Sequence, residues 1–130
     1  TFRSCVGSGC HGSEAVARSI LGVAELRLTT LKTTLDGLLA RVPAAEFSTT
    51  DNRYTTAEGS RFNSSIAGRA GSAAHNPYLT EALLIGSINA VRREYNLAIT
   101  EDIDLRNTLM LPPAERAKRP TTAAALGGGQ

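Results

Sequence analysis

The chain is poor in aromatic residues and has no long apolar run. Its 130 residues include three Phe, three Tyr and no Trp, so Leu, Ala, Val and Ile must build the core unless a large apolar cofactor supplies part of it. No apolar segment approaches the length of a membrane span, so we expect none. A chain of this length is expected to form one domain.

An excess of charge of one sign is also missing. The 14 Lys and Arg residues nearly balance the 12 Asp and Glu residues, which leaves a formal net charge of +2. Proteins that bind nucleic acid usually carry a strongly basic face, so we expect no nucleic-acid partner. We recognise no signal peptide, and the chain begins at Thr1 rather than Met. A processed mature protein, or a piece of a longer one, would look like this.

Cysteine and histidine are rare, with two of each, yet three of these four residues lie in the segment Cys5-Val6-Gly7-Ser8-Gly9-Cys10-His11. Two cysteines followed at once by a histidine are typical of covalent haem attachment. The thiols add across the porphyrin vinyl groups, and the imidazole coordinates the iron. The usual spacer of two residues is four here, and its glycines allow a longer loop to fold back. We therefore predict a c-type haem site with Cys5 and Cys10 as thioether anchors and His11 as the proximal iron ligand.

Two other structures would use the same residues. A disulfide between Cys5 and Cys10 would make the chain a helical structural or interaction module in an oxidising compartment, with His11 incidental. Alternatively, Cys5, Cys10, His11 and His75 amount to a Cys₂His₂ zinc set. The zinc site is less favoured because the adjacent Cys10 and His11 would both have to face one ion.

The apolar pattern predicts an all-α fold. One long helix is expected from the Ser13 N-cap to Pro43, a short one from about Thr56 to Ala67, and a second long one from Asn76-Pro77 to about Thr100. Both long helices carry apolar stripes at helical spacing. The stripes are Ala24, Leu28, Leu31, Leu35, Leu38 and Val42 in the first helix, and Leu84, Ile88, Val91, Tyr95 and Ala98 in the second. We expect the two long helices to pack as an antiparallel pair.

These elements divide the chain into two parts. Residues 1–100 are expected to form a single-haem helical domain, with a short N-terminal haem-attachment loop before the helix pair. Residues 101–130 are expected to form an irregular, extended tail in which Pro112-Pro113 stops any helix. From Thr121 the tail is rich in Ala and Gly, so it is either disordered or docked on a partner.

The second axial position of the iron has two candidate ligands, His75 and Met110, and could also stay open. His75 precedes a strong helix start that would hold its ring, and Ala73 and Ala74 leave room beside it for a porphyrin. The alternative for His75 is a capping or solvent-exposed role. For Met110 we favour filling a gap in the core, with iron ligation as the runner-up. An open position ranks last because no acid–base group is evident near it.

Several short motifs resemble one known family. They are Tyr54–Asn63 (YTTAEGSRFN), His75-Asn76-Pro77-Tyr78 and Leu83-Leu84. Together with the cysteine segment they resemble the C-terminal helical region of multihaem c-type cytochromes. That group includes ammonia-forming nitrite reductase and the octahaem hydroxylamine oxidoreductase and tetrathionate reductase enzymes. The resemblance covers roughly residues 5–97.

In that family a haem-binding segment precedes a long helix, and a histidine followed by Asn-Pro supplies a distal ligand to a haem. The resemblance therefore implies Cys5 and Cys10 as anchors, His11 as proximal ligand and His75 as distal ligand. This chain has one haem motif where the family has several, so the family's catalytic haems have no counterpart here. The four-residue spacer is a second departure.

Two imidazole ligands would leave no place for substrate on the iron, so the haem could only change its oxidation state. We therefore expect an electron-transfer protein with one haem c and no catalytic residues, rather than an enzyme. A single haem needs a redox neighbour, so the expected partners are other cytochrome or redox subunits, including copies of this chain in a haem-stacked assembly. Because such haems are attached outside the cytoplasm, the resemblance implies a periplasmic, cell-surface or extracellular location.

Overall fold

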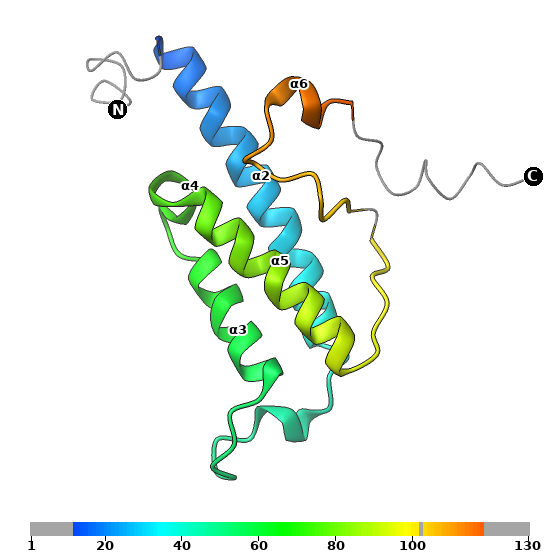
Figure 1. The fold of residues 1–130 in the computed structure, drawn as a ribbon. Helices are drawn as coiled ribbons and strands as arrows, with labels where there is room; N and C mark the ends of the chain where they lie inside the picture. The colour runs from blue at the N-terminus through cyan, green and yellow to red at the C-terminus, as the bar shows by residue number, and fades with distance from the viewer. Residues whose placement is uncertain (1–11, 102, 119–130) are drawn as a thin grey trace, which may run out of the picture.

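The computed structural model describes residues 12–101 and 103–118, and these residues form an all-α structure without strands. Three helices make up its body: α2 (Glu14–Leu39), α3 (Thr56–Ala67) and α5 (Pro77–Glu94). The shorter segments are the 3₁₀ helix η1 (Ala44–Phe47), α4 (Ser72–His75) and α6 (Pro113–Arg116) (Figure 1). The predicted all-α class is therefore confirmed, and the two long helices α2 and α5 pack against each other.

Each of the three body helices begins at a residue whose side chain caps it. Ser13 and Asn76 each accept a hydrogen bond from the backbone N–H three residues further on, at 3.2 and 3.1 Å. Thr55 does the same at 3.2 Å, and the Glu58 carboxylate accepts the N–H of Thr55 at 3.0 Å, which completes a capping box. The helix starts predicted from Ser13, Thr56 and Asn76-Pro77 are confirmed.

Both long helices end earlier than predicted. α2 ends at Leu39, before a turn that leads to Pro43. α5 ends at Glu94 because Asn96 adopts a left-handed conformation (φ 51°) and the N–H of Leu97 bonds back to the carbonyl of Arg92 at 3.1 Å. This is the usual hydrogen bond of a helix that ends on a left-handed residue.

The two long helices run in the same direction, so the expected antiparallel pair is wrong. Their first turns line one cavity, and beyond their far ends Arg41 donates a hydrogen bond to the carbonyl of Ala98 at 2.7 Å. α3 runs the opposite way: Ser64 bonds to Asp36, and Gly68, four residues later, lies against Lys32, four residues earlier in α2. α3 thus returns the chain toward the start of α2, and α5 begins there and runs parallel to α2 (Figure 1).

The core forms where α2, α3 and α5 meet. The five predicted stripe residues within α2 are buried, as are Val42 just after its end and the first three stripe residues of α5, and Ala57 of α3 joins them. Leu31, Leu35, Leu84, Ile88 and Val91 are completely shielded from solvent. Tyr95 is partly buried against this cluster, whereas Ala98 lies beyond the end of α5 and is exposed. The two predicted stripes are therefore the core, apart from this last position.

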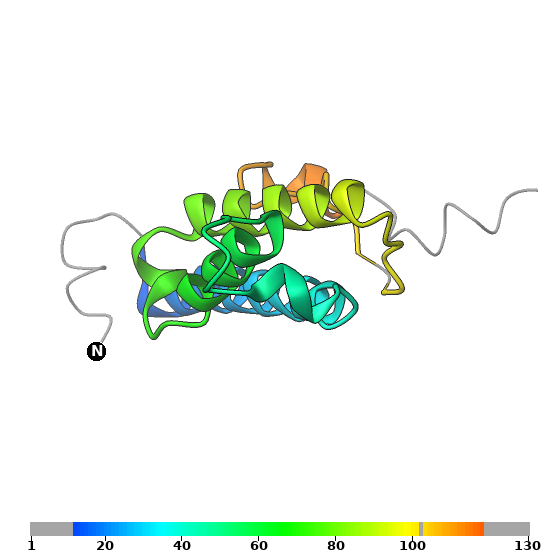
Figure 2. The same ribbon diagram turned by 90° about the horizontal axis from the view of Figure 1, so that it is seen from below.

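The segment 103–118 lies back against the helices, with Ile103 buried in the core (Figures 1 and 2). It is held by a buried ion pair between Arg27 of α2 and Glu81 of α5, at 2.8 Å. Arg27 also donates to the carbonyl of Asp104 at 3.0 Å, and Glu81 accepts the N–H of Leu109 at 2.7 Å. Each partner of the pair thus binds the segment once.

Pro113 occupies the first position of α6, so the Pro pair begins a one-turn helix instead of preventing one. The expected disorder or docking of the chain from Thr121 lies outside the described residues. Among the helices of the described part, none combines the length and apolar character that crossing a membrane requires.

Candidate functional site

Three of the four residues predicted to bind haem lie outside the described residues. Cys5, Cys10 and His11 precede Gly12, where the description begins. Within residues 12–101 and 103–118 no three His, Cys, Asp or Glu side chains are grouped closely enough to hold a metal ion. The predicted haem and zinc sets both include residues before Gly12, so neither set lies wholly within this part of the chain.

His75 is the last residue of α4 and directly precedes the N-cap of α5. Its N–H donates to the carbonyl of Gly71 at 2.9 Å. Gly71 has φ 86°, and a Cβ added there would lie 3.1 Å from Cδ2 and 3.4 Å from Nε2 of the imidazole. The ring therefore lies against the Gly71 backbone. The side chain is exposed, and its nitrogens make no hydrogen bond within the described residues.

An apolar cavity of about 330 Å³ lies beside His75. One wall comes from the first turns of α2 and the other from α4 and the start of α5. The side chains of Ile20 and Leu21 face those of Ala73 and Ala74 across it. The cavity thus brings His75 together with Ala73 and Ala74, the two residues that the sequence analysis placed beside a porphyrin.

Sequence analysis missed a second apolar stripe on α2, formed by Val16, Ile20, Val23 and Leu26. These side chains are 44–71% exposed, and Tyr78 and Leu79 at the start of α5 are similarly exposed. Their spacing of four, three and three residues was visible in the sequence. Its meaning becomes clear once the core face of α2 is known, because a helix packs through one apolar face and these residues form a second apolar face outside the core. Exposed apolar patches of this kind mark surfaces that a ligand or partner covers.

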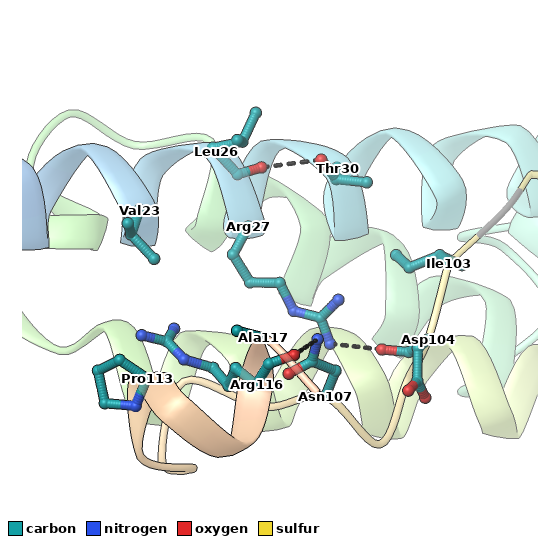
Figure 3. Close-up of a pocket in the computed structure, with 10 residues that line it drawn as sticks. All are labelled: Val23, Leu26, Arg27, Thr30, Ile103, Asp104, Asn107, Pro113, Arg116 and Ala117. Carbon is teal, nitrogen blue, oxygen red and sulfur yellow. Dashed lines mark hydrogen bonds between the residues drawn. The ribbon is translucent and has the colours of Figure 1, made fainter. Parts of the chain in front are cut away.

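Two more cavities continue along α2. One of about 230 Å³ shares Ile20, Ala24, Pro77 and Tyr78 with the His75 cavity. The next, of about 460 Å³, is drawn in Figure 3 and shares Val23, Pro113 and Arg116 with the second. The surface between α2, α5 and α6 is therefore hollowed in three adjoining places, from His75 to Asp104.

The preferred interpretation of Met110 is wrong, because this side chain is 79% exposed and fills no gap in the core. The N–H of the preceding residue, Leu109, is bonded to Glu81, and Leu109 lines the 230 Å³ cavity. With Leu109 facing the body, its neighbour in the chain faces solvent. Its role as a runner-up iron ligand stays a prediction.

Comparison with known proteins adds no relative. No protein-family model matches the chain, and neither a curated protein nor a solved structure matches it. The features that bear on function are therefore the cysteine–histidine segment, the short motifs and the geometry around His75.

Proposed function

We propose that the chain is a c-type cytochrome that carries one haem and transfers electrons to neighbouring haems or redox subunits. Cys5 and Cys10 form the thioether bonds, and His11 and His75 are the axial ligands. The observation that carries this proposal is the apolar cavity beside the imidazole of His75, which makes no hydrogen bond within the described residues. Pockets for large cofactors are concave and mostly apolar, with a few polar groups that fix orientation.

The position of the attachment segment in the chain supports the proposal. Gly12 and Ser13 alone separate His11 from α2, whose first turns form one wall of the cavity. Gly12 has φ 67°, a left-handed conformation that lets the chain turn sharply before α2. A haem bound covalently through Cys5 and Cys10 is therefore tethered close to His75.

The lining of the cavity also favours a porphyrin over a smaller ligand. Four alanines, at positions 17, 24, 73 and 74, line the cavity with short side chains, and the exposed side chains of Ile20 and Tyr78 also line it. A porphyrin in this space would cover apolar surface that is otherwise in water. It would also give His75 a partner for its ring nitrogen.

With imidazoles on both faces the iron has no open position for substrate, so the function is electron transfer rather than catalysis on a bound molecule. The donor and acceptor are other redox subunits, among them copies of this chain. The exposed stripe of α2 supports such a contact, because it extends beyond the His75 cavity as far as Leu26. Covalent haem attachment implies a periplasmic, cell-surface or extracellular location.

The first test is production of the chain in a bacterium that attaches c-type haem in its periplasm. The expected product has the mass of the polypeptide plus one haem, and the reduced spectrum keeps its sharp bands in denaturant. A colourless protein of unmodified mass contradicts the proposal. If that protein contains a Cys5–Cys10 disulfide or one zinc ion, the structural module is the correct alternative.

The second test concerns the distal ligand. The His75→Ala variant should keep its covalent haem but lose the low-spin spectrum, because one axial imidazole is removed. Asn89→Ala, an exposed position later in α5, and Met110→Leu serve as controls that should leave the spectrum unchanged. A low-spin spectrum and unchanged reduction potential in His75→Ala would exclude His75, and loss of that spectrum in Met110→Leu would assign the position to Met110.

A further inference from the structure

We propose that Arg116 binds the carboxylates of the haem, so that the C-terminal segment completes the cofactor site. This inference rests on the proposed function. Haem is amphipathic, with an apolar macrocycle and two propionate carboxylates on one edge. A carboxylate that lies in an apolar groove needs a cation or hydrogen-bond donors close by, because losing its water is costly.

Arg116 has a donor to offer. Its Nε is buried and makes no hydrogen bond with any described residue. A buried guanidinium N–H without an acceptor is unusual, because such groups almost always have a partner. The missing acceptor is what a carboxylate provides, and the planar guanidinium fork matches a carboxylate with two parallel hydrogen bonds.

The position of Arg116 fits the amphipathic shape of the ligand. It lines the 230 Å³ cavity, which shares four of its residues with the His75 cavity. Among the described residues that line these two cavities, Arg116 is the one side chain with a formal charge at neutral pH apart from the titratable His75. The apolar groove therefore has the iron ligand at one end and a cation at the other.

Figure 3 shows that the Arg116 side chain extends toward Pro113, on the Val23 side of the cavity drawn there, and away from Arg27 and Asp104. This direction is toward the first half of α2, where the His75 cavity lies. Arg27 is the other cation that lines the cavity of Figure 3, and it already pairs with Glu81 and the carbonyl of Asp104. Arg116 is thus the arginine that remains available to a ligand.

The expected consequence is electrostatic. Reduction makes the haem more negative, so a cation beside its carboxylates stabilises the reduced form and raises the reduction potential. The same cation keeps the carboxylates ionised at neutral pH. Among the described residues that line the neighbouring cavity, the other charged ones are Arg27, which pairs with Glu81, and Asp104, and they are the same in every variant below.

The test compares the haem-loaded full chain with Arg116→Gln, Arg116→Lys and Arg93→Gln. The last is a matched control that removes the same charge from an exposed position in the last turn of α5. Arg116→Gln should lower the reduction potential more than Arg93→Gln and make it depend on pH in the neutral range, because the carboxylates then bind protons more readily. Arg116→Lys should restore most of the potential because it keeps the charge.

Circular dichroism of the haem band and of the helices, measured on each variant, separates a local change at the haem from loss of folding. If Arg116→Gln and Arg93→Gln have the same potential and the same pH dependence, the inference is wrong while the cytochrome remains. If Arg116→Gln fails to fold, the folded Arg116→Lys variant decides. A reduction potential equal to that of the wild type supports the role of the charge, and a potential as low as that of a variant without this charge refutes it. A colourless wild-type protein would instead refute the proposed function and this inference with it.

Discussion

The buried ion pair between Arg27 and Glu81 gives the sharpest prediction about stability. In Arg27→Met the aliphatic stem is kept, but the Glu81 carboxylate, whose side chain is 3% exposed, loses the cation 2.8 Å away. Removing one partner of a buried pair costs about 3–5 kcal/mol, because the remaining charge stays buried without compensation. The hydrogen bond from the N–H of Leu109 to Glu81 remains, so we expect the loss of folding free energy to lie near the lower end of this range. A domain is stable by only about 5–15 kcal/mol, so the loss is large.

Urea denaturation followed by circular dichroism measures this loss. Arg18→Met is the matched control on the same helix. Its pair with Glu14 is 61% and 48% exposed, so screening by water limits the expected loss to less than about 1 kcal/mol. The double variant Arg27→Met/Glu81→Gln should recover most of the loss, because the amide carries no charge and still accepts the N–H of Leu109. A loss below about 1 kcal/mol in Arg27→Met would refute the reasoning.

Two further predictions concern the glycine turn and an alkaline transition. Gly71→Ala should cost about 1–2 kcal/mol in urea denaturation, because φ 86° is unfavourable for alanine. The added Cβ would also press on His75, so in the proposed cytochrome it should perturb the haem spectrum. Gly22→Ala, in open space on α2, should instead gain about 0.5–1 kcal/mol, so equal effects would contradict the turn argument. Burial, reinforced by the hydrogen bond to Glu46 at 2.9 Å, raises the pKa of Tyr95 above its ordinary 10.0. The stability that Tyr95 contributes is therefore fully present below pH 10.0 and is lost as the pH rises through the raised pKa. As the pH becomes alkaline, the urea midpoint of Tyr95→Phe should therefore fall less than the urea midpoint of the wild type.

The sequence alone determined where helices begin and which faces they bury. Ser13, Thr55 and Asn76-Pro77 cap or open helices through bonds to residues within one turn, so the starts can be read from the local sequence. The stripes of α2 and α5 are likewise periodic features of short segments. The sequence also indicated that Ala73 and Ala74 leave room beside His75, and the structure places both with His75 around one cavity.

Only the tertiary structure decided the direction of the helices and the path of the C-terminal segment. α2 and α5 are parallel because α3 returns the chain between them, a fact about the order of packing that the periodicity of either long helix does not contain. Arg27 and Glu81 are 54 residues apart, and nothing in the sequence near either shows that they pair. That pair holds the segment that exposes Met110 and places Arg116 beside the groove. Helix caps and apolar stripes depend on neighbours a few residues away, so they can be recognised in a single sequence. The direction of the helices, the packing of the C-terminal segment and the buried ion pair depend on contacts between residues far apart in the chain, which a single sequence does not reveal.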